Sequence, residues 1–288
     1  MMKLALGTTQ FGLDYGVSNS QGQVCPNEVT KILSLAKQAG INTLDTAPAY
    51  GNSEQVLGAT RLTQQFSIVS KIPALSNNEI DIEHYVKSSL QHLNIKKLSA
   101  VLFHQVQDII SSTHAKKRFN ALVKLKEQGK ITKIGISVYS PAQLEYCFGH
   151  YQFDIVQLPL NCFDQRFIQT NWLQKLSDSG IEIHCRSLFL QGLLLMEPEK
   201  LPTYFNPFKK HFHRFINIAK QLNISPLCLA LTIGHQYNSI EKMVIGCCNI
   251  KQLSEIISAN AIAKEIKKDL SSLTCENENL LIPSNWHL

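Results

Sequence analysis

Short apolar runs alternate with helical patterns from one end of the 288-residue chain to the other. Each run has the length and the β-branched content of a buried strand, and a segment of helical or mixed spacing follows it. The predicted strands are residues 3–7, 41–45, 66–71, 98–104, 131–137, 153–159, 181–187 and 242–246. The pattern therefore predicts eight strands, with enough chain between neighbours for a helix.

The segment after the first strand illustrates how the helices are predicted. Apolar side chains keep the spacing of one helical face from Val29 to Ala39, and Gly40 fits a C-terminal stop. Ser225 and Pro226 are residue types that favour the first turn of a later helix. Further helices are predicted near residues 53–61, 79–93 and 114–128.

Strands joined by helix-length crossovers pair in parallel, with the helices outside the sheet. Eight such units close into a (β/α)8 TIM barrel of the α/β class, and no low-complexity linker interrupts residues 1–288, so a single domain is predicted. An open doubly wound sheet is the structural alternative. Its dinucleotide-binding form needs GxGxxG after the first strand, and "LALGTTQFG" does not supply it.

Composition narrows the class of protein. Hydrophobic residues make up 44% of the chain and charged residues 17%, and no apolar run approaches the ~20 residues of a membrane-spanning helix. The N-terminus lacks the features of a secretory signal, so we expect a cytoplasmic protein without a membrane partner. The net charge of +6 is dispersed over short clusters, which argues against a nucleic-acid partner. The eight cysteines show neither CxxC pairs nor zinc-type spacing, which favours reduced, mostly buried thiols and no metal site.

Ionisable side chains gather at three consecutive predicted strand ends. Asp45 ends the second strand and Tyr50 lies in the loop after it, while Lys71 and His104 end the third and fourth strands. Taken singly, each has an ordinary structural role as a turn cap, a loop aromatic, a solvated strand end or a core histidine. Because the carboxyl ends of barrel strands form the active face, their joint occurrence favours a catalytic site.

These residues carry a resemblance to the aldo-keto reductase family that runs over nearly the whole chain. The segment "LDTAPAYGNSE" resembles the family's Asp-Thr-Ala-x-x-Tyr-Gly-x-Ser-Glu motif, "VSK" its strand-end lysine and "LFH" its strand-end histidine. The resemblance implies a (β/α)8 barrel that binds NADP(H) in extended form and reduces aldehydes or ketones to alcohols. It also implies a catalytic tetrad of Asp45, Tyr50, Lys71 and His104.

The chemistry of these side chains agrees with that assignment. When hydride adds to a carbonyl carbon, the oxygen needs a proton donor within hydrogen-bond reach, and Tyr50 is the expected donor. A free tyrosine has a pKa of about 10, so a Lys71 ammonium held by Asp45 would favour the phenolate needed in the reverse direction. His104 is expected to donate a hydrogen bond to the carbonyl oxygen. No metal is required.

Further matches concern the cofactor. Ser137 and Gln157 stand where the family binds the nicotinamide carboxamide, and "CRSLFLQGLL" resembles the segment that stacks on nicotinamide and wraps the pyrophosphate, with Arg186 in the stacking position. The cofactor-binding residues that the resemblance implies are Gly7, Thr8, Asp45, Ser137, Gln157, Arg186, Ser187, Leu188, Phe189, Gln191, Gly192, Gly246, Cys247, Cys248, Gln252 and Glu255.

The chain departs from the family pattern in ways that bear on the cofactor. Val138 stands where many members have Asn beside the serine. On the adenine side, Lys, Ser and Arg of the family pattern are replaced by Cys247, Cys248 and Gln252. NADP(H) is the favoured cofactor and NAD(H) the alternative, with Lys251 as the one plausible substitute for the missing cations.

Two classes of function follow. The leading hypothesis is an NAD(P)H-dependent reductase of a small aldehyde, ketone or sugar-like carbonyl, and the alternative is a nucleotide-binding sensor or scaffold with little turnover. Residues 205–215 interleave phenylalanines with cations, which favours a packed helical stripe with solvated charges; a phosphate-bearing substrate is the alternative interpretation. Neither the physiological substrate nor the oligomeric state is assigned by the sequence.

Overall fold

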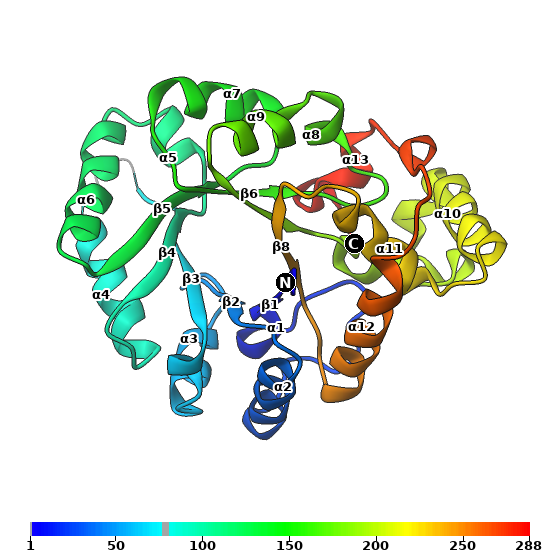
Figure 1. Ribbon diagram of the computed structural model, residues 1–288, viewed down its shortest axis with the longest axis horizontal. Helices are drawn as coiled ribbons and strands as arrows, with labels where there is room; N and C mark the ends of the chain where they lie inside the picture. Colours follow the sequence, from blue (N-terminus) through cyan, green and yellow to red (C-terminus); the bar gives the residue numbers. More distant parts are fainter. Residues whose placement is uncertain (1, 77–80) are drawn as a thin grey trace.

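Eight parallel strands close into a barrel in chain order, and the last strand pairs with the first. The computed structural model describes residues 2–76 and 81–288 (Figure 1). The strands are β1 Leu4–Gly7, β2 Thr43–Asp45, β3 Ser67–Ile72, β4 Leu98–Phe103, β5 Ile131–Ser137, β6 Ile155–Pro159, β7 Glu182–Arg186 and β8 Ile240–Ile245. The predicted (β/α)8 barrel with a single domain is confirmed.

Helices surround the barrel and connect its strands (Figure 1). They are α1 Thr9–Gly12, α2 Pro26–Gln38, α3 Ser53–Ala59, α4 Ile82–His92, α5 Gln107–Ile110, α6 Ala115–Glu127, α7 Pro141–His150, α8 Arg166–Gln169, α9 Trp172–Asp178, α10 Lys209–Gln221, α11 Pro226–His235, α12 Ile250–Ala263 and α13 Glu278–Leu281. The 3-10 turns are η1 Thr63–Gln65, η2 Leu190–Leu195, η3 Pro198–Lys200, η4 Thr203–Phe208, η5 Ser271–Leu273 and η6 Pro283–Asn285.

The helix signals in the sequence correspond to the observed ends. Gly40 has a φ of +79° two residues after α2 ends, a conformation that favours glycine. The Ser225 hydroxyl accepts a hydrogen bond from the Cys228 amide and caps α11, as predicted. The helix predicted near residues 79–93 is observed as α4 from Ile82, and residues 79 and 80 lie outside the described part.

The core has two parts. Most buried apolar side chains pack between the outer surface of the barrel and its helices, whereas Val69, Ala100, Leu102 and Ile155 form a small separate cluster. In both cavities that the structure shows at the barrel ends, polar and charged side chains form much of the lining. The apolar side chains of the strands therefore stabilise the barrel, and polar groups line the cavities at its two ends.

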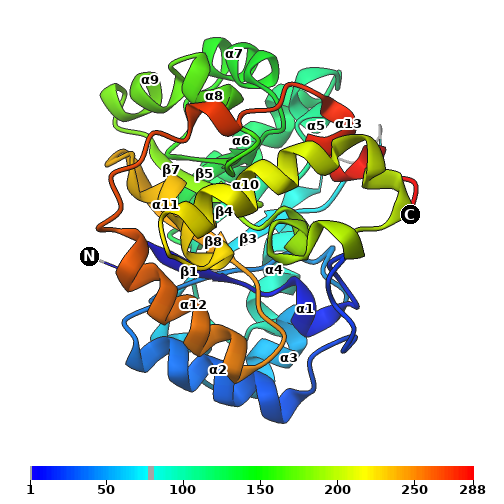
Figure 2. The ribbon, with the colours of Figure 1, turned by 90° about the vertical axis from the view of Figure 1, so that its right-hand side faces the viewer.

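The segment after α12 crosses the molecule from one end of the barrel to the other. Figure 2 shows it running from the side of the N-terminus, past α8, to the side of the C-terminus. Trp286 packs edge-on against Phe205 with ring centroids 5.1 Å apart, and the Tyr204 hydroxyl donates to the Asn285 carbonyl at 2.9 Å. These contacts attach the end of the chain to η4.

Two further expectations concern burial. All eight cysteines are free, and only Cys25 is exposed, so the expected unpaired and mostly buried thiols are confirmed. In the described part of the chain, no single helix is long and apolar enough to cross a membrane. The segments Thr203–Gln221 and Pro226–His235, bent by 91°, satisfy that criterion only as a pair, by length and composition alone.

Two glycines allow the loops after β1 and β2 to touch. A β-carbon at Gly12 would overlap the Tyr50 carbonyl oxygen, and one at Gly51 would overlap the Gly12 carbonyl oxygen. Gly51 also has a φ of +58°. Because neither position leaves room for a side chain, this contact fixes the path of the backbone that carries Tyr50.

We expect Gly12→Ala to lower the free energy of unfolding by about 1–3 kcal/mol, because the new methyl group forces the two loops apart. Gly149→Ala is the matched control, since a β-carbon there has no heavy atom within 4 Å and alanine favours the helix. Urea unfolding of both variants compares them. Equal stabilities would show that the loop contact tolerates a methyl group.

Candidate active site

A cavity of about 590 Å³ opens at the carboxyl ends of the strands. Tyr50 and His104 line it, together with most residues that the resemblance assigned to the cofactor. These are Gly7, Asp45, Ser137, Gln157, Arg186, Ser187, Leu188, Phe189, Gln191, Gly192, Gly246, Cys247, Cys248, Gln252 and Glu255. The structure therefore brings residues from seven strand ends and their loops together around one cavity.

Lys71 connects two of the predicted catalytic residues. Its ammonium lies 2.6 Å from Asp45 Oδ1 and donates to the Tyr50 hydroxyl oxygen at 3.2 Å. A third hydrogen bond goes to the Thr46 carbonyl at 3.0 Å. Lys71 is buried behind the cavity wall, so the cavity exposes Tyr50 and not the lysine.

The ion pair keeps this buried lysine charged. Burial by itself lowers the pKa of Lys71, but the Asp45 carboxylate and Tyr50 outweigh burial and the pKa is raised. The second oxygen of Asp45 is also satisfied, because Gln157 Nε2 donates to Oδ2 at 2.7 Å. Gln157, which the resemblance assigned to the nicotinamide carboxamide, is thus also a neighbour of the tetrad.

His104 lies beside Tyr50, with ring centroids 5.8 Å apart and a nearly perpendicular orientation of 86°. Burial, and next the positive charge of Lys71, lower the pKa of His104 to about 4, with Arg186 acting in the same direction. The imidazole is therefore neutral at physiological pH. A neutral ring carries one N–H and can donate one hydrogen bond into the cavity.

The rest of the "DTAPAYGNSE" motif anchors the loop that carries Tyr50. The Ser53 hydroxyl donates to the Thr8 carbonyl at 2.9 Å, and the Thr8 hydroxyl donates to the Asp45 carbonyl at 3.1 Å. Glu54 is buried and accepts a hydrogen bond from Ser70 at 2.7 Å. These bonds join the ends of β1, β2 and β3.

Thr8 is the one residue of the implied cofactor set that is not among the described residues lining the cavity. Its side chain is fully buried between Asp45 and Ser53. In this position, the Thr8 hydroxyl helps to hold the backbone of Asp45 in place.

Arg186 is held flat on the cavity wall. Its guanidinium carbon lies 4.0 Å from the centre of the Tyr139 ring, and its Nη2 donates to the Val138 carbonyl at 3.1 Å. Its Nη1 donates to the Ser187 hydroxyl at 3.2 Å. All these partners are neutral, so Arg186 contributes a positive charge to the cavity in which Tyr50 lies.

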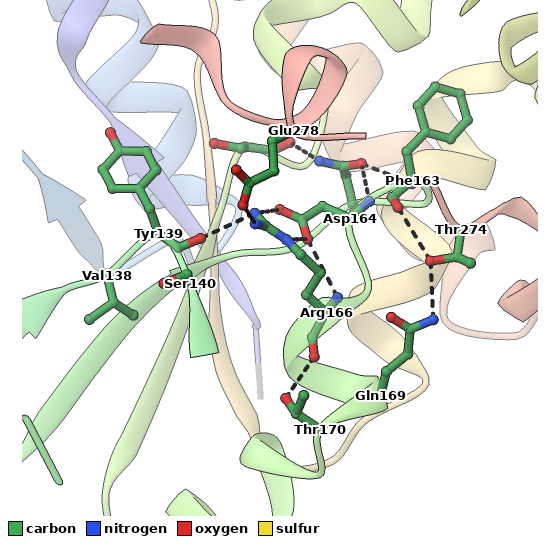
Figure 3. A network of polar contacts seen from close by, with 12 residues as sticks. Val138, Tyr139, Ser140, Phe163, Asp164, Arg166, Gln169, Thr170, Thr274 and Glu278 are labelled. Atoms are coloured by element: carbon green, nitrogen blue, oxygen red, sulfur yellow. Dashed lines mark hydrogen bonds and ion pairs between the residues drawn. The ribbon is translucent and has the colours of Figure 1, made fainter. Parts of the chain in front are cut away.

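A second arginine supports this wall from outside. Figure 3 shows Arg166 between Asp164, the Tyr139 carbonyl and Glu278. Its Nη2 lies 2.8 Å from Asp164 Oδ2 and 3.1 Å from the Tyr139 carbonyl, and its Nη1 lies 3.3 Å from Glu278. The network ties the C-terminal segment to the backbone of the residue that Arg186 stacks on.

The segment after β7 contains a cluster of left-handed backbone conformations. Ser187, Leu190 and Gln191 have φ values of +65°, +48° and +52°, and Gly192 has +90°. A β-carbon at Gly192 would overlap the Ser18 hydroxyl, so the loops after β7 and β1 meet there. Turns of this kind direct successive amide groups to one side, an arrangement suited to anions such as a pyrophosphate.

The far end of the cavity is formed by residues 246–256. The Cys248 amide donates to Gln252 Oε1 at 2.7 Å, so the Gln252 side chain is turned back to its own loop. Glu255 places a carboxylate at the lining, whereas Lys251 is exposed and is not among the described lining residues. No lysine belongs to the described lining, and Arg186 is its one arginine.

Sequence reasoning missed two aromatic residues of the cavity. Tyr15, after β1, and Tyr139, after β5, both line it. Burial raises the pKa of Tyr15 to about 12, so its phenol stays protonated. Both residues follow predicted strand ends at the active face, and this position in the sequence could have identified them as lining residues.

The segment 205–215 behaves as the packed-stripe interpretation predicts. Phe212 and Phe215 are buried against Phe163, with ring centroids 5.1 and 6.1 Å away. The basic residues of the segment are not among the described residues that line the active-site cavity; they are Lys209, Lys210, His211, His213 and Arg214. Lys210, His213 and Arg214 line a separate surface cavity instead, and the phosphate-bearing substrate stays an alternative interpretation.

The chain belongs to the aldo/keto reductase family, because the profile of the Aldo/keto reductase family matches residues 3–273. Membership makes it a carbonyl-reducing oxidoreductase of a family that uses nicotinamide cofactors and acts on small molecules. The uncharacterized oxidoreductase YqkF of Bacillus subtilis is 23% identical, over 95% of this chain and 95% of that protein. The NADH-specific methylglyoxal reductase of Escherichia coli is 26% identical, over 67% of this chain and 69% of that protein.

Solved structures share the fold at lower identity. The aldo-keto reductase AKR11C1 from Bacillus halodurans in its holo form has a TM-score of 0.73 and 18% identity, with coverage of 94% of this chain and 91% of that one. The glycerol dehydrogenase AKR11B4 from Gluconobacter oxydans has a TM-score of 0.73 and 19% identity, with coverage of 98% and 93%. These similarities show the barrel architecture.

The lowered pKa of His104 predicts a pH-dependent contribution to stability. An unfolded histidine takes up a proton near pH 6.5, whereas folded His104 stays neutral down to about pH 4. The unfolded state therefore binds more protons in this window, and stability falls as the pH is lowered through it. We expect the free energy of unfolding to fall more for the wild type than for His104→Asn when the pH is lowered from 7 to about 4.5. Denaturant unfolding at both pH values tests this, and a constant difference would contradict it.

Proposed function

We propose that this protein reduces the carbonyl group of a small aldehyde, ketone or sugar-like substrate with NADPH or NADH, and that Tyr50 is the proton donor. The observation that carries the proposal is the chain of hydrogen bonds from Asp45 through Lys71 to the Tyr50 hydroxyl, 2.6 and 3.2 Å long, which ends at the cavity. The hydrogen-bonded triad favours turnover over a sensor without catalysis.

Each residue has a distinct part in the proposed reaction. A bound reduced nicotinamide supplies the hydride for the carbonyl carbon. His104, neutral at the working pH, donates its N–H to the carbonyl oxygen and orients the substrate. Tyr50 transfers its proton to the oxygen as negative charge develops there. The resulting phenolate keeps its hydrogen bond from the Lys71 ammonium, whose own charge Asp45 balances.

The residues for cofactor binding are proposed from their places in the cavity. Ser137 and Gln157 are near the tetrad and suit the carboxamide, and Arg186 presents a flat guanidinium beside them. The turn from Ser187 to Gly192 suits the pyrophosphate. The loop of Cys247 and Cys248, with the first turns of α12, suits the adenosine.

Tyr50→Phe is expected to lower kcat by about 10²–10⁴-fold, because it removes the proton donor and little packing. The dissociation constant of NADPH, measured by fluorescence quenching, should stay near the wild-type value. Tyr146→Phe is a control that removes an exposed phenol from α7. Near-normal turnover in Tyr50→Phe would refute the assignment, whereas cofactor binding without turnover in the wild type would favour a sensor.

Lys71→Met should act through the same proton transfer, so its loss in kcat and that of Tyr50→Phe should be far from additive in the double variant. Because the change leaves Asp45 buried without its cation, the folding of each variant is first checked by circular dichroism. Additive losses would show that Tyr50 and Lys71 do not act as one unit.

We also propose that the protein discriminates weakly between NADPH and NADH. The 2′-phosphate of NADPH needs cations, and the adenosine end of the described cavity presents Glu255 and neutral side chains. The existence of an NADH-specific relative in Escherichia coli supports this proposal, although the two sequences differ at most aligned positions.

The dissociation constants of NADPH and NADH are measured for the wild type, Lys251→Ala and Gln252→Arg. We expect a preference for NADPH well below a thousandfold, or ~4 kcal/mol, and no change in Lys251→Ala, since Lys251 is exposed away from the cavity. Gln252→Arg should tighten NADPH binding and leave NADH binding unchanged. A strong preference for NADPH that survives Lys251→Ala would show that another cation contacts the 2′-phosphate.

A further inference from the structure

A second cavity, of about 440 Å³, opens at the other end of the barrel, where the strands begin. It shares no lining residue with the active-site cavity. Its charged and polar lining comes mainly from β1, β5, β7 and β8 and the residues next to them, and includes Lys3, Lys133, Glu182, His184 and Lys242.

Small and apolar residues of the barrel make room for this cavity. Val69, Ala100 and Ile155 give it an apolar wall, and Ser67 and Ser99 add short side chains. Barrel interiors are usually filled by layers of bulky branched side chains. A cavity of a few hundred Å³ with an apolar wall and a few polar groups has the size and character of a small-molecule site.

The positive charges at this cavity are incompletely balanced. Lys133 forms an ion pair with Glu182. Lys242 instead donates to the Met2 carbonyl at 3.2 Å and to Asn42 Oδ1 at 3.0 Å. Lys3 donates to the Tyr237 carbonyl at 2.8 Å. In residues 2–76 and 81–288, no carboxylate forms an ion pair with Lys3 or Lys242.

The burial of Lys242 makes this imbalance costly. The residue is only 9% exposed, and burial lowers the pKa of both Lys242 and Lys3. A buried cation without an ion-pair partner is destabilising. Glu182 raises the pKa of Lys242 and Glu241 raises that of Lys3, but neither carboxylate forms an ion pair with these lysines, and Glu241 accepts the Ile183 amide at 2.7 Å.

His184 adds an independent observation. It is 1% exposed and lines the cavity, and its Nε2 lies 2.7 Å from Glu182 Oε1. Its Nδ1 is buried without a hydrogen-bond partner among the described residues. Buried polar atoms of side chains nearly always have a partner. With Nε2 donating to Glu182, Nδ1 of a neutral ring is an acceptor, which a water beside a bound ligand could satisfy.

We propose that this cavity is a second binding site, for a small organic carboxylate. The carboxylate would supply the ion-pair partner that Lys242 and Lys3 lack, and its hydrocarbon part would pack on Val69, Ala100 and Ile155. A compact, strongly hydrated anion such as phosphate uses the cations but gains nothing from the apolar wall. The wall therefore favours an aliphatic carboxylate over an inorganic anion.

Isothermal titration calorimetry with sodium butyrate tests the proposal on the full chain without cofactor. Sodium chloride at the same ionic strength controls for screening, and 1-butanol controls for the hydrocarbon part alone. We expect saturable binding of butyrate only, and an upward shift of the melting temperature that grows with its concentration. Lys242→Met should weaken butyrate binding by at least about tenfold.

Lys242→Arg, which keeps the charge, should retain binding, and Lys117→Met, which removes an exposed cation from α6, should behave as the wild type. If Lys242→Met does not fold, Lys3→Met replaces it with the same expected direction. Butyrate binding that is absent, that persists unchanged in Lys242→Met and Lys3→Met, or that phosphate matches would overturn the proposal. None of these measurements uses carbonyl reduction, so the two functional proposals fail or succeed separately.

Discussion

The ion pair between Lys71 and Asp45 is the constraint on which the candidate active site depends. Both side chains are almost fully buried, so each needs the other to remain charged inside the barrel. Lys71 uses its remaining hydrogen bonds to hold the Tyr50 hydroxyl and the Thr46 carbonyl. Burial is the main cause of the lowered pKa of His104, and the positive charge of Lys71 adds to it while Asp45 opposes it. The position of the phenol and the charge of the lysine thus have one common origin, and the same lysine contributes to the neutrality of the imidazole.

Several layers of structure keep that pair in place. Gln157 satisfies the second oxygen of Asp45, and the Ser53 and Thr8 hydroxyls tie the ends of β1 and β2 together. On the opposite wall, Arg166 holds the Tyr139 backbone, and Tyr139 in turn supports Arg186. Through Glu278 this support extends to the C-terminal segment (Figure 3). Preorganised polar groups of this kind need little rearrangement when charge develops during a reaction.

The buried lysines at the two ends of the barrel have different kinds of partners. At the carboxyl ends of the strands, the lysine is paired with a carboxylate and points to a phenol. At the amino ends, Lys242 lines a cavity and has only neutral hydrogen-bond partners. Barrel loops at the active face commonly determine chemistry, whereas the opposite face commonly determines stability. A carboxylate site there would connect stability to the concentration of a small metabolite.

The sequence by itself predicted the strands, their order and the gathering of Asp45, Tyr50, Lys71 and His104 at strand ends, because hydrophobic period and strand-end position are local properties of the chain. It did not determine that the Thr8 side chain faces Asp45 and Ser53, since a shift of one residue along a strand turns the side chain to the other face. Tyr15, Tyr139 and the Arg166 network also required the tertiary structure, because their partners lie on other strands and loops. The same holds for the cavity around Lys242: the balance of buried charges depends on distances between strands, and only the closed barrel sets those distances.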